Sequence, residues 1–180
     1  MDTTNEALLL EQLRCEATRH AAFGVLVERY GERLYWHIRK IVLQHADADD
    51  VLQNTFIKAW EGIAGFRGNA QLFTWLFRIA TNESITFLNH TKRLQHLTIG
   101  DARQALSNLC ATDAHFCATD AQQKLQAAIL TLPERQRIVF NMRYFDEMPY
   151  EQISEVLGVS VGALKASYHI AEQKIKKYFG

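Results

Sequence analysis

The residues best suited to hold a metal ion form one short pattern, Cys110-x4-His115-x-Cys117, with His90 or His96 as a candidate fourth ligand. Thiolates and imidazoles bind zinc, but the ligand pairs of a structural zinc site are usually roughly two to four residues apart. Because this spacing differs and the surrounding pattern is weak, we expect no metal and no cofactor. Zinc binding or redox sensing by Cys110, His115 and Cys117 is kept as a minor alternative.

Groups able to act as acid, base or nucleophile are scarce. Glu83 projects into the middle of an apolar helical stripe, where a buried acid held by an arginine or by hydrogen bonds is the simpler interpretation. A catalytic carboxylate would need a second polar group, and the sequence offers none nearby. It also lacks a nucleophile motif such as G-x-S-x-G. We therefore expect a protein that is not an enzyme.

Aromatic rings alternate with arginine after the glycine-rich segment 62–70, which indicates a different chemistry. Phe73 and Phe77 lie off the core stripe of this helix, with Arg78 close by. The core stripe consists of Leu72, Trp75, Leu76, Ile79 and Phe87. Unstacked bases need rings to stack on and cations for their phosphates. By spacing alone, packing of both phenylalanines against a neighbouring helix is an equal alternative.

Residues 148–171 have the pattern of a helix-turn-helix. Pro149 suits a first helical position, Gly158 can adopt the positive φ that ends a helix, and Ser160 is a good N-cap for the next helix. The side chains expected to point inward are Ile153, Leu157, Val159, Leu164 and Tyr168. Such a motif lays its second helix in the major groove of DNA. A purely structural hairpin is the alternative.

The charge balance limits what this motif can do alone. The chain has 20 basic and 20 acidic residues, a formal net charge of zero. Within the helix-turn-helix, the one basic residue, Lys165, is outnumbered by two acidic residues, Glu151 and Glu155. Autonomous DNA-binding proteins carry a positive excess, because phosphate contacts supply most of their non-specific affinity. We therefore expect a large nucleic-acid-binding partner to supply most of the contacts with the DNA backbone.

Helical periodicity dominates the chain and predicts an all-α fold of two small helical domains joined by a flexible linker. Four or so helices are expected in the first half, with breaks at Gly31, 45–50 and 62–70. A second helical unit begins near Ala121, and the capping-box spacing of Thr131-Leu-Pro-Glu134 predicts a helix start there. The predicted domains are 1–95, the linker 96–121 and 122–180.

Neither a membrane helix nor a signal peptide is apparent, since apolar runs are short and the first residues lack a basic segment. We expect no insertion into a membrane and a cytoplasmic location. The three cysteines are too few for a disulfide framework, which agrees with that location.

Residues 47–60 are expected to form one more helix, with Asp50, Gln53, Asn54 and Ile57 on one face. That face is either simply solvated or a docking surface.

Both halves of the chain carry the motifs of one family. They are Asp49-Asp-Val-Leu-Gln-Asn-Thr-Phe-Ile-Lys-Ala-Trp60, Phe66-Arg-Gly68 and Phe73-Thr-Trp-Leu-Phe-Arg-Ile-Ala-Thr-Asn82, then Leu132-Pro-Glu-Arg-Gln-Arg137 through Ser160-Val-Gly-Ala-Leu-Lys-Ala-Ser-Tyr-His169. The first set resembles region 2, and the second resembles region 4, of bacterial extracytoplasmic-function (ECF) sigma factors. Together they span most of the chain in the family's order.

The resemblance implies a protein that binds core RNA polymerase, directs it to promoter DNA and helps melt the minus-ten element. The implied polymerase contacts are Asp50, Gln53 and Asn54, on the clamp coiled coil. The 65–71 loop and the helix after it would bind the minus-ten element through Arg67, Asn69, Phe73, Arg78 and Asn82. The second helix of the helix-turn-helix would read the minus-thirty-five element through Ser160, Lys165, Ser167 and His169.

The resemblance also implies an anti-sigma factor as a partner, and the family's pattern is not followed everywhere. Asn54 stands where an acid is common, and Ser167 and Ile170 stand where arginine is common. Fewer cations mean fewer bidentate guanine contacts, so the promoter sequence does not follow from this helix. A stand-alone helix-turn-helix regulator is the alternative function, but it leaves the motifs of the first half unexplained.

Overall fold

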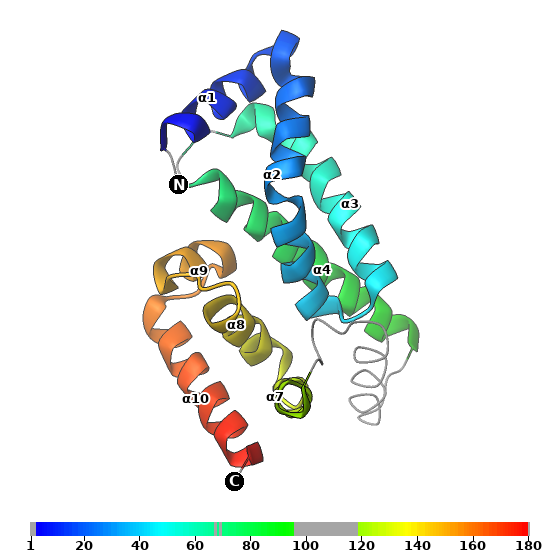
Figure 1. Cartoon of the computed structure of the whole chain (residues 1–180), viewed down its shortest axis with the longest axis vertical. Coiled ribbons are helices and arrows are strands. Elements are labelled where there is room, and N and C mark those ends of the chain that lie inside the picture. The colour runs from blue at the N-terminus through cyan, green and yellow to red at the C-terminus, as the bar shows by residue number, and fades with distance from the viewer. Residues whose placement is uncertain (1–2, 67, 69, 96–118, 180) are drawn as a thin grey trace.

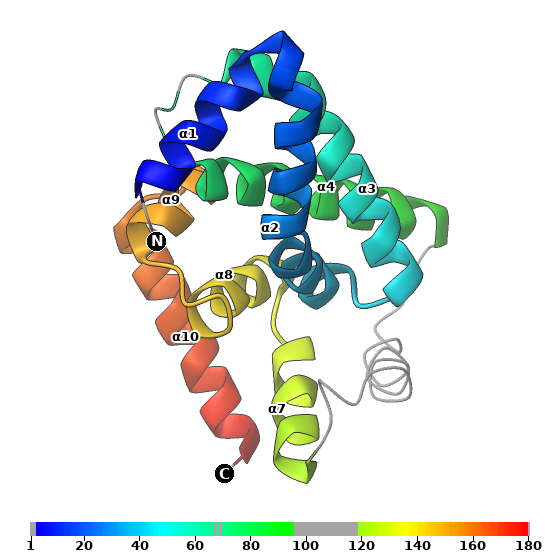
Figure 2. The ribbon, with the colours of Figure 1, turned by 45° about the horizontal axis from the view of Figure 1, so that its top comes forward.

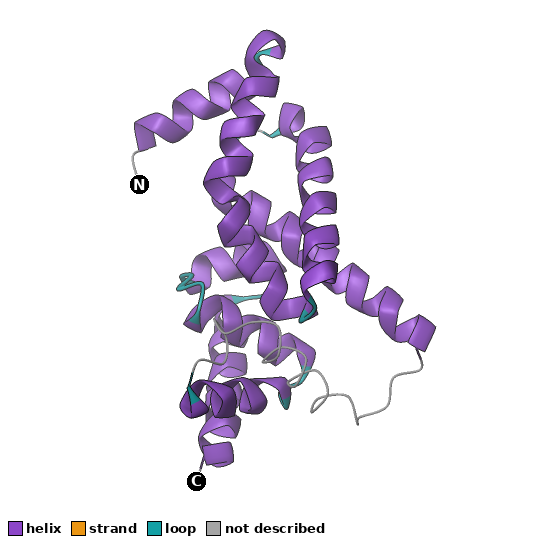
Figure 3. Ribbon diagram, turned by 45° about the vertical axis from the view of Figure 1, so that its right-hand side comes forward, coloured by secondary structure: helices purple, strands orange, loops and turns teal. Residues whose placement is uncertain are grey.

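The computed structural model describes residues 3–66, 68, 70–95 and 119–179, and every regular element in these ranges is a helix (Figures 1 and 3). The first group is α1 (Thr3–Arg14), α2 (Glu16–Val42), α3 (His45–Gly62), the 3-10 turn η1 (Ile63–Gly65) and α4 (Leu72–Gln95). The second is α7 (Asp120–Leu130), α8 (Glu134–Tyr144), α9 (Tyr150–Leu157) and α10 (Val161–Phe179). The all-α prediction is confirmed. None of the helices described is long and apolar enough to cross a membrane.

Helix α2 runs through Gly31, so the break predicted there is wrong. A helical glycine costs about 1 kcal/mol, which the buried residues on either side, Tyr30 and Leu34, outweigh. The chain turns instead at Leu43, whose φ of 71° is left-handed and whose N–H donates to the Arg39 carbonyl. Helix α3 therefore begins at His45, inside the stretch predicted to be a break.

Helices α2, α3 and α4 pack side by side around the core of the first group, and α1 lies across one end of α2 (Figure 1). The predicted break at 62–70 is confirmed, since α3 ends at Gly62 and α4 begins at Leu72. The Glu6 carboxylate of α1 accepts a hydrogen bond from the Leu72 N–H at 3.0 Å. A carboxylate is favoured at a helix N-terminus, so α1 helps to fix where α4 starts.

The start of the second group differs from the predicted capping. The capping box is at Thr119 and Gln122, where each side chain accepts a hydrogen bond from the other residue's backbone N–H. The Thr131 hydroxyl instead donates to the Ala128 carbonyl, so the capping box expected from Thr131 is wrong. Helix α8 nevertheless begins at Glu134, directly after Pro133.

The helix-turn-helix forms as the sequence indicated. Gly158 adopts a φ of 66° between α9 and α10, and the Ser160 hydroxyl accepts a hydrogen bond from the Ala163 N–H. Ile153 and Leu164 are buried between the two helices. Val159 is 40% exposed, so the prediction that its side chain fills the corner of the turn is wrong.

The two groups of helices pack on each other rather than standing apart. Helix α8 lies against α2, and α9 lies against α4 (Figure 2). Several side chains of the second group belong to the main core of the first. They are Ile138, Val139, Met142, Met148, Ile153 and Val156. The chain therefore folds with the helix-turn-helix held against the first bundle.

Candidate nucleic-acid interface

Helix α3 presents a polar face to solvent. Asp50, Gln53 and Asn54 are exposed, and Ile57 beside them is 50% exposed, while Thr55 is buried on the opposite side. Partial burial raises the pKa of Asp47, and the neighbouring Asp50 raises it further. A face with this acidic start repels phosphate, so its chemistry suits a protein surface better than DNA.

Two of the predicted minus-ten residues lie on one exposed face of α4. Arg78 and Asn82 are both exposed and stand one helical turn apart. This pair offers a cation for phosphate and an amide for a base edge. Arg67 and Asn69 of the preceding loop lie outside the described residues.

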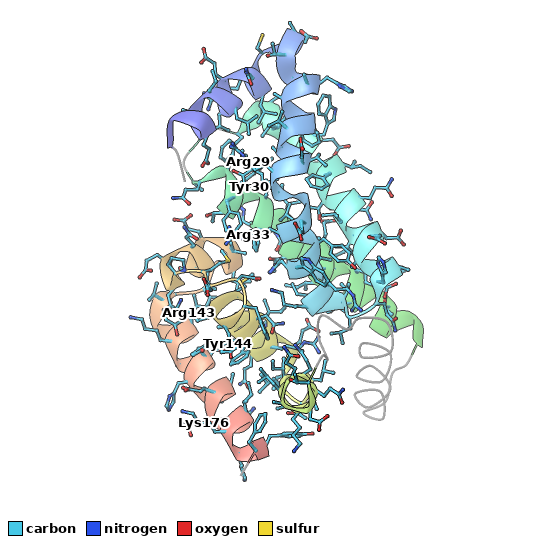
Figure 4. All side chains as sticks on the ribbon, viewed as in Figure 1. Arg29, Tyr30, Arg33, Arg143, Tyr144 and Lys176 are labelled. Carbon is cyan, nitrogen blue, oxygen red and sulfur yellow. The ribbon has the colours of Figure 1, made fainter. Side chains whose placement is uncertain are left out.

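The structure corrects the prediction for Phe73, whose side chain is 6% exposed and not available to a base in this arrangement. Its ring packs against Phe77, with centroids 4.2 Å apart, and near Tyr30, at 6.3 Å. The Arg33 guanidinium covers its outer side, 4.1 Å from the ring centroid. Figure 4 shows Tyr30 and Arg33 one turn apart on α2. Of the two open interpretations, packing against a neighbouring helix is the one that the structure supports.

Two hollows border the loop before α4. One, of about 470 Å³, is lined by Gly68, Gln71 and Thr74, and the other, of about 560 Å³, by Phe66, Trp75 and Arg78. The Thr74 hydroxyl is buried without a hydrogen-bond partner among the described residues. Gly68 has a φ of 76°, which a residue with a side chain would rarely adopt. Both linings mix polar and apolar groups, and Glu155 of α9 borders each hollow.

The outer face of α10 has few cations. Lys165 and His169 are exposed one turn apart, and Lys165 Nζ lies 5.7 Å from the centre of the Tyr150 ring. Ser160 caps the helix and Ser167 is half-buried, so both are less free to reach a base. Ile170, at 46% exposed, shares this face and was not among the predicted contacts. An exposed apolar side chain of this kind is able to contact a thymine methyl group.

A buried polar cluster joins the two groups of helices. His37 Nδ1 of α2 lies 2.7 Å from Asp146 Oδ2, and Lys40 Nζ also contacts the Asp146 carboxylate. His37 Nε2 lies 2.9 Å from the Thr81 hydroxyl, which itself donates to the Phe77 carbonyl at 2.7 Å. These contacts hold the His37 ring between Asp146 of the second group and Thr81 of α4.

Asp146 is the only acid in this polar cluster, which comprises Asp146, His37, Lys40 and Thr81. Burial raises the pKa of Asp146, but His37 and Lys40 outweigh it, and the pKa is held below its ordinary value. The partners are 109 and 106 residues apart, so no local pattern in the sequence could have indicated the pairing.

The described residues contain no group of three or more potential metal ligands. The pattern Cys110, His115, Cys117 lies outside the described residues. Glu83, considered above as a buried acid, is partly buried and accepts from Lys58 Nζ at 2.5 Å. It is therefore paired, although with a lysine rather than an arginine.

Comparison with known proteins identifies the family. Residues 26–94 match the Sigma-70 region 2 family, and residues 122–175 match the Sigma-70, region 4 family. The chain is 30% identical over 173 residues to the RNA polymerase sigma-H factor of Pseudomonas aeruginosa, a match that covers 87% of this chain and 85% of the relative. It is 27% identical over 164 residues to the ECF RNA polymerase sigma factor SigW of Bacillus subtilis, covering 87% and 88% of the two chains. The chain belongs to the ECF family of sigma factors.

Solved structures agree with this family at the level of the fold. The sigma factor RpoE of Bartonella quintana, solved with the anti-sigma factor NepR, aligns with a TM-score of 0.68 at 19% identity, over 87% of this chain and 96% of that one. CnrH, solved with the cytosolic domain of CnrY, aligns with a TM-score of 0.70 at 22% identity, over 97% and 96%.

This ECF sigma factor is an alternative sigma factor of transcription initiation, whose partners are core RNA polymerase and promoter DNA. The region 2 match includes α3 and nearly all of α4, and the region 4 match includes α8, α9 and most of α7 and α10. A stand-alone helix-turn-helix regulator does not account for the region 2 match.

Proposed function

We propose that this sigma factor divides its work between three faces, none of them catalytic. The α3 face docks on core polymerase through Asp50, Gln53 and Asn54. What supports this is the exposure of all three side chains beside Ile57, because an apolar centre with a polar rim is what a protein interface needs.

The second face is the minus-ten surface, which we define as the 65–71 loop together with Arg78 and Asn82 of α4. Two hollows border this loop, Gly68 within it has a positive φ, and Arg78 of α4 is exposed beside it. Arg67 and Asn69 belong to the same loop and are retained in the proposal. Phe73 is left out as a direct contact because it lies beneath Arg33.

The third face is the outer side of α10, which reads the minus-thirty-five element. Lys165 and His169 are its base-reading candidates, because both side chains are exposed. Ser160 caps the start of the helix, and the side chain of Ser167 is less exposed than those of Lys165 and His169. One lysine and one histidine supply little affinity for phosphate, so this helix selects a site while polymerase supplies most of the binding energy.

The domains that follow from this proposal are region 2 within 1–95, a linker within 96–121, and region 4 within 122–180. We also place the protein in the cytoplasm, where polymerase and DNA are. An anti-sigma factor is a further proposed partner. A groove of about 480 Å³ between the two regions, lined by Trp36 and Lys40 of α2 and Leu125 of α7, gives such a partner contacts with both.

Run-off transcription tests the proposal. Core polymerase with this sigma factor should start transcription at specific sites on genomic fragments, and the sigma factor alone should bind duplex promoter DNA weakly. A matched pair of variants separates the faces. Asn54→Ala should weaken binding to core without changing the start sites, whereas Lys165→Ala should alter promoter choice without changing the affinity for core. Tight sequence-specific DNA binding by the chain alone, with no measurable affinity for core, would refute the proposal.

A further inference from the structure

Helix α1 binds the chain at two points, one at the end of η1 and one at the start of α4. The Glu6 carboxylate accepts a hydrogen bond at 3.0 Å from the N–H of Leu72, the first residue of α4. At the other end of α1, Arg14 Nη2 donates at 3.1 Å to the carbonyl of Phe66, which directly follows η1. The region 2 match begins at residue 26, so both contacts come from a helix that precedes the matched residues.

The joint between α1 and α2 holds α1 in place. The Thr18 hydroxyl of α2 donates to the Gln12 carbonyl at 2.8 Å, and Arg19 Nε of α2 donates to the Leu13 carbonyl at 3.0 Å. The last carbonyls of a helix have no partner within it, so side chains of α2 supply the hydrogen bonds that the end of α1 lacks. The Leu13 side chain is also fully buried. Helix α1 is therefore a fixed part of the first group of helices.

The first turn of α4 needs the contact with Glu6. The first N–H groups of a helix have no partner within the helix, and the helix dipole favours a carboxylate beside them. The Thr74 hydroxyl, in the same turn, has no hydrogen-bond partner among the described residues, so it does not cap the helix. Burial raises the pKa of Tyr30, and the nearby Glu6 charge raises it further. Glu6 thus caps α4 from another helix, beside a buried ring of α2.

The position of α4 decides where its exposed polar face lies. Arg78 and Asn82 follow Leu72 on the same helix, about 9 Å and 15 Å along its axis at a rise of about 1.5 Å per residue. Arg78 is therefore less than two turns from the residue that Glu6 holds. Because a continuous helix moves as one body, a change at its first turn changes the place of Arg78.

We propose that Glu6 and Arg14 are positioning residues for the melted promoter strand. They fix α4 and η1 relative to each other, so that Arg78 and Asn82 meet the strand in the correct place. The inference rests on the proposed function, because it takes Arg78 and Asn82 as contacts of the minus-ten element. A face that is already ordered before the strand arrives loses less conformational entropy when it binds.

The test measures how tightly the complex of this sigma factor with core polymerase binds a melted strand. The probe is a fluorescein-labelled single strand carrying the non-template minus-ten sequence of a promoter mapped by run-off. Glu6→Ala should lower the affinity about three- to tenfold, because it removes the cap of α4. Arg14→Ala should lower it about threefold, through the lost hydrogen bond to Phe66. Glu11→Ala is the matched control and should change nothing, since Glu11 is an exposed acid about 140° around α1 from Glu6.

Further measurements distinguish positioning from general stabilisation. Glu6→Gln keeps an oxygen that accepts from the Leu72 N–H, and Arg14→Lys keeps a donor, so both should retain most of the affinity for the probe. Amide exchange at Leu72 should become faster in Glu6→Ala. The affinity for core polymerase should stay unchanged in every variant, because the α3 face is intact. Equal losses of affinity for core and for the probe would overturn the positioning role. Arg14 is exposed, so Arg14→Ala tests the inference even if Glu6→Ala fails to fold.

Arg78→Ala separates failure of this inference from failure of the proposed function. It should weaken probe binding whether or not α1 positions α4. If Arg78→Ala has no effect, or if the wild-type chain supports no run-off transcription with core, the proposed function fails. If Arg78→Ala weakens binding while Glu6→Ala and Arg14→Ala bind the probe as well as Glu11→Ala does, the positioning role is refuted and the proposed function stands. A higher affinity of Glu6→Ala for the probe would also refute the positioning role, since the carboxylate would then only repel the strand.

Discussion

Replacing Phe73 separates the two roles that an aromatic side chain at this position can have. If the ring packs inside region 2, its shape and volume matter; if it stacks on a melted base, its π face matters. Phe73→Leu keeps an apolar side chain of similar size and removes the ring. Phe73→Ala removes both.

The structure sets the expected magnitudes. Phe73 is 6% exposed and contacts Phe77 and Arg33, with the distances given above. Truncation of such a side chain leaves a cavity, so Phe73→Ala should lower the free energy of unfolding by about 3–5 kcal/mol. Phe73→Leu should cost about 1–2 kcal/mol, since it loses the aromatic contact and the cation–π contact but fills most of the volume.

The assay combines urea denaturation with run-off transcription at a temperature where both variants are folded. The packing role predicts that Phe73→Leu reaches nearly the wild-type level of transcription from the same start sites. A Phe73→Leu protein that is as stable as wild type, yet binds core polymerase normally and cannot open the minus-ten element, would refute the packing role and restore the base contact. Phe77→Leu is the matched control, because Phe77 is fully buried in the same cluster.

Three further predictions concern single positions. Gly158→Ala should lower the stability of region 4 by about 1–2 kcal/mol, because a φ of 66° is left-handed, and the melting temperature should fall accordingly. Lys165→Ala should relax the preference for one base pair of the minus-thirty-five element, measured with the polymerase complex on promoters that differ at single positions; an unchanged preference would mean that Lys165 reads no base. Burial raises the pKa of Asp146, but His37 and Lys40 lower it further, so the pKa lies below its ordinary value of about 3.9. The ionised Asp146 therefore stabilises the folded chain above that ordinary value, and this stabilisation is lost as the pH falls through the lowered pKa. Urea unfolding between pH 6 and about pH 3 should therefore show a steeper acid loss of stability for wild type than for Asp146→Asn, and parallel curves would contradict this.

Local patterns in the sequence predicted the helix-turn-helix and the exposed α3 face correctly. Gly158 and Ser160 act through their own backbone and the next turn, so their types alone indicate where one helix ends and the next begins. The same holds for Asp50, Gln53 and Asn54, since residues three and four apart share a helical face whatever the rest of the fold does.

Where local signals compete with packing, the predictions made from the sequence were wrong. Gly31 is a helix breaker by propensity, yet α2 continues through it because its flanking residues are buried. Phe73 lies off the main apolar stripe of α4, and periodicity treats it as free. It is buried because α2 lies along that side of the helix with Tyr30 and Arg33.

The sequence by itself thus determined the helix-turn-helix, the motifs of the two sigma regions and the exposed polar face of α3. Only the tertiary structure decided what those surfaces face within the chain. Asp146 meets His37 across 109 residues, and Gln152 of α9 meets Gln71, just before α4, across 81 residues. The physical reason is that burial, ion pairing and hydrogen bonding depend on neighbours in space, and pairings over such separations leave no periodicity in the sequence.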